Sequence, residues 1–458
     1  MEGKKKGIHL KTTQIIALGF FIMITVGGFL LTLPISSVSG EPTPWVDALF
    51  TATTSSCVTG LVTVVTADHW SYFGQAVILF MIQFGGLGVV SFTTFLLMFV
   101  GKRISIKQRL LIQEAYGLDS MTGVVRMVIR MVKGTLIVEG IGAVLYMLVF
   151  VPDYGLKGIW MSVFTSISAF CNAGIDLIGP QSLAPYVSNP LINLVTMLLI
   201  VIGGIGFLVW WDIVAMAKKI RKKHIGLRQG IRELALHTKV VLIFTALLIF
   251  GGALLVFCFE YTNPKTLGPL GLGSKIWASL LQSVTWRTAG FFTIDQGALH
   301  NSTLLIGVIW MFIGGSPGGT AGGVKTMTIA MLVLAVVSML KGRDDVEIGN
   351  RRIPYRDVIK GISVIIMQMV IWLTSTLLMC VVESQFSFMQ IWYEVTSALG
   401  TVGLTMGITP LLSTLGKYII ILTMYFGRLG PITLAMALKV PSRQKQFRRK
   451  LPEGKIAI

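Results

Sequence analysis

One spacing pattern constrains the fold of this chain more than any other feature. A short segment recurs four times, starting at a tryptophan, continuing through small or hydroxylated residues and ending at a glycine that precedes an apolar residue. The four glycines lie 114, 116 and 113 residues apart along the chain: Gly60, Gly174, Gly290 and Gly403. Such a regular interval indicates an internal repeat, so the chain is expected to divide into four similar units.

A second glycine motif follows each of the first, 24 to 29 residues further on. Each unit is therefore expected to contain a helix, a short re-entrant segment and a second helix. The re-entrant segments are too short and too polar to cross a membrane again, and such backbone is tolerated at membrane depth only inside protein or beside water. The expected helices span residues 12–33, 71–101, 127–151, 189–217, 236–261, 301–340, 357–383 and 415–438.

The bilayer is the natural solvent for a chain of this composition. Hydrophobic residues make up 53% of it and charged residues 13%, and its mean hydropathy is +0.77. The first apolar run, Thr12 to Leu33, follows several lysines and is too long for the core of a signal peptide. It therefore predicts a first membrane-spanning helix with a cytoplasmic N-terminus. The four cysteines lack metal-ligand spacing and are expected to be reduced thiols.

The predicted fold is an all-α polytopic membrane protein with four parallel helix–pore-loop–helix repeats around a pseudo-fourfold central pore. The expected units are residues 1–101, 102–217, 218–340 and 341–458. The third has an interrupted second helix with an intramembrane loop, and the fourth ends in a basic cytoplasmic tail.

The distribution of basic residues predicts the orientation. Of the 39 lysines and arginines, 32 lie in the N-terminus, the connections between units and the C-terminal tail, and five lie on the side of the glycine-centred segments. This bias places both termini in the cytoplasm of a bacterial cell and the four segments outside. The net charge of +19 alone could indicate a nucleic-acid partner. The basic clusters lack the interleaved aromatic residues that single-strand binding requires, so no nucleic-acid partner is expected.

The glycine-centred segments favour a selectivity filter. Backbone carbonyls from several loops can replace the water shell of a monovalent cation, and glycine permits the backbone geometry that aims them at one axis. We expect K⁺ to be coordinated there by carbonyls of the following residues: Val58, Thr59, Gly60, Asn172, Ala173, Gly174, Thr288, Ala289, Gly290, Thr401, Val402 and Gly403. The alternative is a set of packing glycines between helices, which are common in membrane proteins.

Several charged residues near these segments have two interpretations each. Asp176 directly follows the second segment, where a carboxylate either concentrates cations or lies solvated in a loop. Asp47 and Glu394 occupy positions in the short helices that favour capping or anchoring. Arg287 is expected to face away from the axis, and Glu139 is a candidate partner that the sequence does not pair with it.

A gate is predicted in the third unit. Its second helix is interrupted by a flexible glycine-rich loop in which Pro317 and several glycines make a continuous helix improbable. We expect this loop to block ion flow below the filter, held closed by Arg428 through loop carbonyls or a pore-facing acid. The alternative is a structural helix break with Lys325 extending to the cytoplasm. The predicted gate comprises Gly314, Gly315, Ser316, Pro317, Gly318, Gly319, Thr320, Ala321, Gly322, Gly323, Lys325 and Arg428.

These motifs together resemble the Trk/Ktr/HKT potassium transporters, and most closely the membrane subunits of bacterial Ktr systems. The resemblance covers essentially the whole chain, and four filter glycines resemble the potassium-selective pattern of that family. It implies a membrane-embedded subunit of a potassium uptake system with channel-like conduction, often stimulated by Na⁺, and no bound cofactor besides these ions. It also implies a homodimer and a cytosolic nucleotide-binding RCK ring (KtrA-like) as regulatory partner.

The alternatives to a channel-like subunit are a secondary active transporter and an enzyme. A secondary active transporter, moving a small solute with sodium by alternating access, typically uses inverted repeats. Every unit here is expected to start in the cytoplasm, which makes the repeats parallel. An enzyme is not expected, because the five histidines are scattered and form no metal-ligand or nucleophile–base arrangement.

Overall fold

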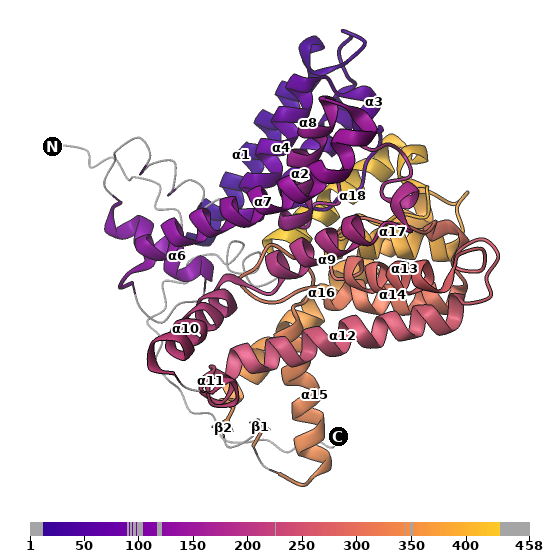
Figure 1. Cartoon of the computed structure of the whole chain (residues 1–458). Coiled ribbons are helices and arrows are strands. Elements are labelled where there is room, and N and C mark those ends of the chain that lie inside the picture. Colours follow the sequence, from indigo (N-terminus) through magenta and orange to yellow (C-terminus); the bar gives the residue numbers. More distant parts are fainter. Residues whose placement is uncertain are drawn as a thin grey trace, which may run out of the picture.

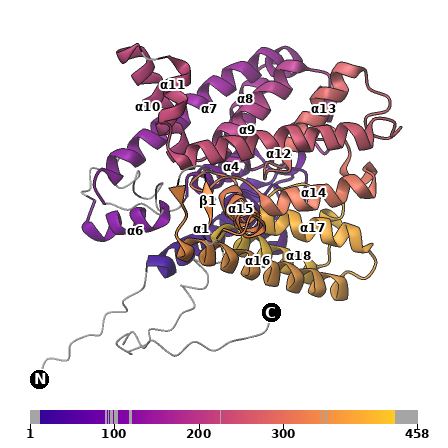
Figure 2. The ribbon, with the colours of Figure 1, turned by 90° about the horizontal axis from the view of Figure 1, so that it is seen from below.

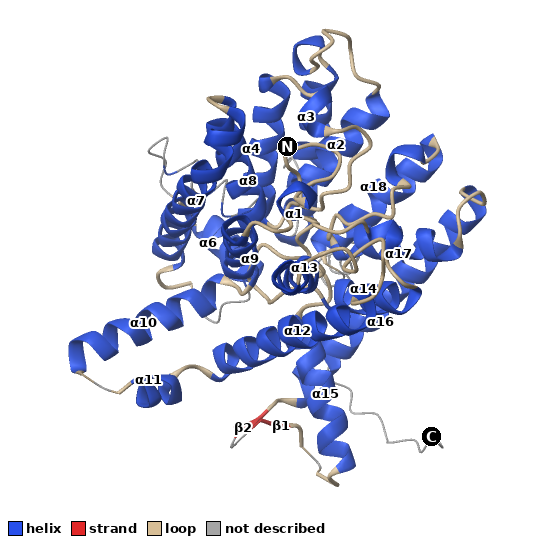
Figure 3. Cartoon of the chain, turned by 45° about the vertical axis from the view of Figure 1, so that its right-hand side comes forward, coloured by secondary structure: helices blue, strands red, loops and turns tan. Residues whose placement is uncertain are grey.

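Helices make up nearly all of the regular structure (Figures 1 and 3). The structure, a computed structural model, describes residues 12–88, 104–116, 121–224, 226–343, 345–348 and 351–430, with Ser91, Thr94 and Met98. Its elements are α1 (Thr12–Thr32), η1 (Pro34–Ser36), α2 (Trp45–Cys57), α3 (Thr66–His69), α4 (Tyr72–Leu87), α6 (Ile106–Tyr116), α7 (Val124–Tyr154), α8 (Lys157–Cys171), η2 (Ala184–Tyr186), α9 (Pro190–Gly204), α10 (Phe207–Lys223), α11 (Leu227–Glu233), α12 (Leu236–Glu260), α13 (Leu272–Thr285), η3 (Gln296–Ala298), α14 (Asn301–Ile313), α15 (Thr326–Leu340), β1 (Glu347–Ile348), β2 (Arg351–Arg352), α16 (Tyr355–Val382), α17 (Phe388–Gly400), η4 (Thr409–Leu411) and α18 (Thr414–Leu429).

Long apolar helices alternate with short ones along the chain. Within the described ranges, α1, α7, α12 and α16 are long and apolar enough to cross a membrane. Each is followed by a short helix of 13 to 15 residues, namely α2, α8, α13 or α17. A helix satisfies its own backbone hydrogen bonds, which is what a bilayer demands of a spanning segment.

Polar side chains cap the first turns of four helices, α4, α9, α17 and α18. Ser71, Asn189 and Ser413 accept backbone N–H groups of the first turns of α4, α9 and α18. Ser387 and Gln390 form a reciprocal capping box at the start of α17. These side chains satisfy backbone donors that the first helical turn leaves free.

The helices pack in a closed cycle. In sequence order they form four triplets: α1, α2 and α4; α7, α8 and α9; α12, α13 and α14; α16, α17 and α18. The last helix of each triplet packs on the short helix of the next one: α4 on α8, α9 on α13, α14 on α17, and α18 back on α2. Viewed from below, α15 lies near the middle of the molecule (Figure 2). The cycle therefore surrounds a common centre.

The two ends of the described chain complete this cycle. Lys417 Nζ at the start of α18 lies 2.7 Å from Asp47 Oδ1 in α2. The hydroxyl of Tyr425 donates to the carbonyl of Ala17 in α1 at 2.9 Å. Contacts between residues about 400 positions apart close the ring, as in a toroidal repeat protein.

The expectation of one continuous helix over 189–217 was wrong. α9 ends at Gly204, and α10 leaves it at an angle of 102° after a break at Ile205 and Gly206. The positive φ of Gly206, 94°, ends the helix at the second glycine motif. Within the expected helices 71–101 and 415–438, α4 ends at Leu87 and α18 ends at Leu429. Most of the residues expected to continue these two helices, up to 101 and 438, lie outside the part of the chain that the structure describes.

The break is thus not peculiar to the third unit. Gly88 and Gly430, which follow α4 and α18, also have a positive φ, of 81° and 75°. The lysines before Thr12 and the tail from Lys439 onward, on which part of the expected orientation rests, lie outside the described residues.

Candidate functional site

Each short helix ends in the same unusual turn. In each turn, a residue with a left-handed backbone is followed by one with a negative φ and then by a glycine with a positive φ. The left-handed residue directly follows α2, α8 and α17, whereas Thr288 lies three residues after the end of α13. The non-glycine φ values are 56° for Val58, 62° for Asn172, 67° for Thr288 and 52° for Thr401, and the glycine values are 105° for Gly60, 65° for Gly174, 86° for Gly290 and 97° for Gly403. Left-handed non-glycine residues cost of order 1–3 kcal/mol and cluster at functional sites. When left-handed and right-handed backbone conformations alternate along a chain, successive carbonyl groups point toward the same side of it.

Hydroxyl groups of the short helices stabilise three of these turns. Thr54 Oγ1 accepts the N–H of Gly60 at 2.9 Å, and Ser397 Oγ accepts that of Gly403 at 3.0 Å. Ser168 Oγ accepts the N–H of Ile175 at 3.1 Å. Sequence reasoning noted the hydroxylated segments but assigned these side chains no role. In the sequence, such a role is indicated by a serine or threonine six or seven residues before the residue whose N–H it accepts.

The four glycines meet in a ring. A Cβ built on each would lie within 2.8 Å of the carbonyl oxygen of the residue before the next glycine. In cyclic order the pairs are Gly60 with Ala173 O (2.5 Å), Gly174 with Ala289 O (2.6 Å), Gly290 with Val402 O (2.8 Å) and Gly403 with Thr59 O. No side chain fits at such distances, so only glycine lets these backbones approach. We call residues 58–60, 172–174, 288–290 and 401–403 the four-turn junction. It brings together every residue predicted for the filter.

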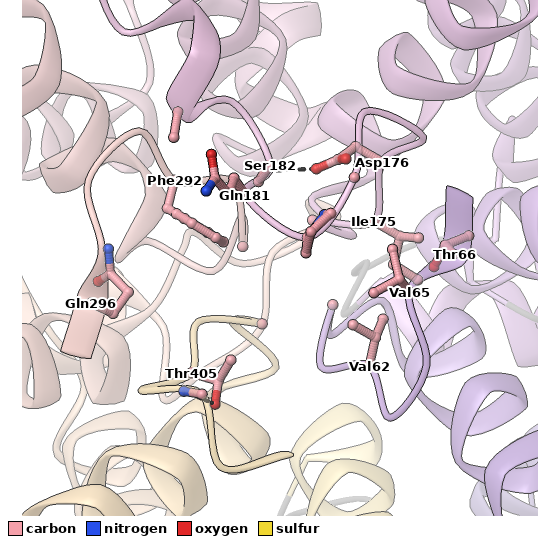
Figure 4. A pocket seen from close by; sticks show the side chains of 18 of the residues that line it. Val62, Val65, Thr66, Ile175, Asp176, Gln181, Ser182, Phe292, Gln296 and Thr405 are labelled. Atoms are coloured by element: carbon pink, nitrogen blue, oxygen red, sulfur yellow. Dashed lines mark hydrogen bonds between the residues drawn. The ribbon is translucent and has the colours of Figure 1, made fainter. Parts of the chain in front are cut away.

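A cavity of about 490 Å³ opens on one side of the junction (Figure 4). The four junction glycines line it, together with Thr405, Gln296 and Asp176. Asp176 is buried, and its two carboxylate oxygens accept from Ser182 Oγ at 2.6 Å and from the N–H of Ile178 at 3.0 Å. This carboxylate therefore holds its own loop at the wall of the cavity, and its burial differs from the solvated loop carboxylate that was one of its two interpretations.

The glycine-rich loop, residues 314–325, covers the opposite side of the junction. Thr320 Oγ1 lies 3.1 Å from Asn172 Oδ1, and the N–H of Gly322 donates to Thr288 Oγ1 at 3.0 Å. A Cβ on Gly322 would collide with Thr401 Oγ1. The loop thus contacts the first residues of three of the four turns.

The loop is firmly hydrogen-bonded, whereas a flexible segment was expected. The N–H groups of Ser316 and Thr320 donate to the carbonyls of Gly204 and Gly203 at the end of α9, at 3.0 and 3.1 Å. The N–H of Phe207 donates to the carbonyl of Gly318 at 3.0 Å. The bend between α9 and α10 therefore supplies the polar backbone groups that hold the loop.

Two basic side chains reach the loop. Arg428 in α18 donates to the carbonyl of Thr320 at 2.6 Å and to that of Gly85 in α4. The ammonium group of Lys325 donates to the carbonyls of Ala321 and Gly322 within its own loop. Of the two partners expected for Arg428, a loop carbonyl or an acid, the loop carbonyl is present.

The backbone of Lys325 is strained. Its φ and ψ, 87° and 133°, match those of Gly206 (94°, 140°), Gly88 (81°, 138°) and Gly430 (75°, 148°). This region of backbone space is almost restricted to glycine. A lysine thus stands in a conformation that glycine adopts at the three corresponding breaks.

Arg287 and Glu139, which the sequence left unpaired, form hydrogen bonds with different residues. The Arg287 guanidinium is buried behind the third turn and donates from Nη2 to Thr245 Oγ1 in α12 at 3.3 Å. The Glu139 carboxylate in α7 accepts from Gln83 Nε2 in α4 at 3.2 Å. Arg287 thereby links the third turn to the long helix α12.

These features define a multi-pass, all-helical membrane protein in which four glycine turns approach one another closely. Residues 4–449 match the family model described as TrkH, cation transport protein. The chain belongs to this family, which consists of transporters and not enzymes.

Known relatives match over nearly the full length. The "Potassium/sodium uptake protein NtpJ" of Enterococcus hirae is 39% identical, with 98% of each chain covered. The "Ktr system potassium uptake protein B" of Bacillus subtilis is also 39% identical, covering 98% of this chain and 97% of that protein. The crystal structure of the potassium transporter TrkH from Vibrio parahaemolyticus is similar in fold, with a TM-score of 0.73 and 18% identity, over 96% of this chain and 87% of that one.

Proposed function

We propose that the chain is the ion-translocating subunit of a potassium uptake system and that the four-turn junction is its selectivity filter. The observation that carries this proposal is the cyclic approach of each junction glycine to a carbonyl oxygen of the next turn. Four sets of carbonyls on one axis can replace the hydration shell of K⁺. Two relatives are named as potassium or potassium/sodium uptake proteins, which supports the choice of ion.

In this proposal the helix triplets are four parallel repeats around a pseudo-fourfold pore, with the unit boundaries given by the sequence. The short helices point their C-terminal ends toward the junction. Their partial negative charges favour a cation near the first residue of each turn. K⁺ would pass from the 490 Å³ cavity through the junction toward the loop.

The glycine-rich loop is the gate of this pore. It covers the junction where Asn172, Thr288 and Thr401 begin the turns, so ions cannot leave while it stays there. Arg428 holds the loop in place through the carbonyl of Thr320. Opening requires this bond and those to the end of α9 to break together.

Orientation and partners complete the proposal. The basic connections lie in the cytoplasm with both termini, and the 490 Å³ cavity faces outward. The family resemblance adds a homodimer and a cytosolic nucleotide-binding RCK ring as regulator, with sodium as a stimulating ion. The molar mass of the purified protein in detergent tests the dimer, which requires twice the 50.0 kDa of one chain.

Growth of a bacterium that lacks its own potassium uptake tests the function. We expect the wild-type chain to restore growth at low K⁺, and Gly290→Ser and Gly403→Ser to abolish this effect, because each adds a side chain where a carbonyl lies within 2.8 Å. Gly273→Ser is the matched control, since a Cβ there meets nothing within 4 Å. Counterflow of a small solute without net K⁺ uptake would instead favour alternating access.

A further inference from the structure

Two adjacent residues of α17, Tyr393 and Glu394, hold the chain segments that leave the third and fourth turns. Both side chains are fully buried. Glu394 reaches the segment of its own triplet, and Tyr393 reaches that of the preceding triplet. One helix thus connects the outer parts of two neighbouring turns.

Glu394 binds the segment after the fourth turn through both carboxylate oxygens. Thr405, two residues after Gly403, donates from Oγ1 to Oε2 at 2.6 Å, and Thr409 donates from Oγ1 to Oε1. The hydroxyls of Thr405 and Thr409 are also 3.0 Å apart, and Thr405 accepts the N–H of Gly407. Bonds from hydroxyls to a carboxylate are short and strong, so this segment is fixed at two points.

Tyr393 binds the segment after the third turn. Its hydroxyl donates to Gln296 Oε1 at 2.9 Å. Gln296 also forms a two-bond amide pair with Gln282 of α13, at 2.6 and 3.1 Å, and donates to the carbonyl of Ile294. Gln296 and Gln282 are both buried, which makes the loss of a partner costly.

Both segments reach the proposed conduction path. Thr405 and Gln296 line the 490 Å³ cavity beside the four junction glycines (Figure 4). Discrimination between K⁺ and Na⁺ by a carbonyl ring depends on how the carbonyls are spaced and how freely they move. A brace that fixes two of the four turns relative to one another acts on both properties.

We infer that Tyr393 and Glu394 are positioning residues that set the ion selectivity of the junction. They act through Gln296, Thr405 and Thr409 and do not touch the ion. The inference rests on the proposed function and extends it to residues outside the turns. A purely structural role would lower stability and the transport of both ions together, whereas a positioning role changes the ratio of K⁺ to Na⁺ transport.

The test uses the full-length protein in liposomes, with K⁺ and Na⁺ uptake measured on the same preparation. Tyr393→Phe removes one hydroxyl, and Thr409→Val removes one donor from Glu394 without a large change of volume. We expect each to lower the K⁺/Na⁺ ratio about fivefold or more, the factor that one net hydrogen bond carries. Thr409→Ser, which keeps the donor, should restore the ratio.

Two controls make the same chemical changes elsewhere. Tyr146→Phe removes a fully buried hydroxyl that lies 2.6 Å from Thr196 Oγ1 between α7 and α9. Thr303→Val removes a buried hydroxyl that donates to the Glu260 carboxylate. Both should keep the wild-type ratio even where the melting temperature falls.

The outcomes separate the inference from the proposed function. Wild-type protein that carries K⁺, with a ratio unchanged in Tyr393→Phe and Thr409→Val, overturns the inference alone. Equal losses of selectivity in the control variants overturn it as well. Wild-type protein that carries no alkali cation overturns the proposed function and the inference with it.

Discussion

At the scale of single residues, the four-turn junction is defined by backbone conformation and not by side-chain type. Val58, Asn172, Thr288 and Thr401 range from an apolar to an amide to a hydroxyl side chain, yet all adopt a left-handed backbone at the same point of their turns. The glycines two residues later were found from sequence because only glycine fits there. The left-handed residues before them are of no single residue type. The sequence therefore assigns them to the filter only because they lie next to the glycines.

A glycine substitution tests this reading of the junction. In Gly403→Ala, the added methyl group would collide with the carbonyl of Thr59, and the φ of 97° is unfavourable for alanine. We expect K⁺ uptake to fall at least about tenfold, as backbone strain of roughly 1–3 kcal/mol and the clash displace the turn. Flux into liposomes measures this. Gly273→Ala, in open space on α13, should keep wild-type flux, and equal loss in both variants would contradict the account.

At the scale of helices, the second glycine motifs end or break the later helix of each triplet. The sequence revealed the break in the third unit, because Pro317 and a run of glycines are strong helix breakers. It missed the 102° bend after α9, since only Gly203, Gly204 and Gly206 mark it and glycines also occur inside membrane helices. What makes the bend stable is tertiary: its free carbonyls accept the loop of another triplet.

The strained backbone of Lys325 predicts how the loop opens. Lys325→Ala removes the ammonium bonds to loop carbonyls but keeps the strain, so we expect a leakier pore. Lys325→Gly removes the strain as well and stabilises the closed loop. Strain of roughly 1–3 kcal/mol corresponds to an open fraction about 5- to 150-fold lower in the glycine variant than in the alanine variant.

Single-channel or flux recordings of the two variants measure this difference. The matched pair is Lys341→Ala and Lys341→Gly at the end of α15, where φ is −88° and glycine relieves nothing. That pair should show equal flux. A glycine variant at position 325 as leaky as the alanine variant would show that strain has no part in gating.

At the scale of the whole molecule, the first and last triplets are joined through contacts that close the cycle. The Lys417–Asp47 pair is largely buried, with 15% and 17% of the side chains exposed. A salt bridge in such a position is costly to break from one side, because the remaining charge loses its partner.

A double-mutant cycle measures this closure. We expect Asp47→Asn and Lys417→Gln each to lower the melting temperature in detergent, and the double variant to lose less than the sum of the two, with a coupling of about 1 kcal/mol. Lys360 and Asp357, an exposed pair on α16, provide the comparison, with coupling near zero. Strictly additive losses at positions 47 and 417 would contradict a role in closure.

The order of the helices could be predicted because the sequence repeats: four glycines lie at nearly equal spacing, each between apolar stretches. The triplet order α7, α8, α9 follows directly from that pattern. The engagement of Asp176 by Ser182, and the reach of Tyr393 to Gln296 in another triplet, could not be predicted, because pairings between distant segments leave no local signal.

The most direct test of the central claim is the position of the ion itself. Crystals of the purified protein grown with Rb⁺, a K⁺ substitute with a strong anomalous signal, would locate it by anomalous diffraction. We expect peaks on the axis of the four-turn junction, coordinated by the carbonyl oxygens of Thr59, Ala173, Ala289 and Val402. Ordered Rb⁺ elsewhere in the protein, with the junction axis empty, would contradict it.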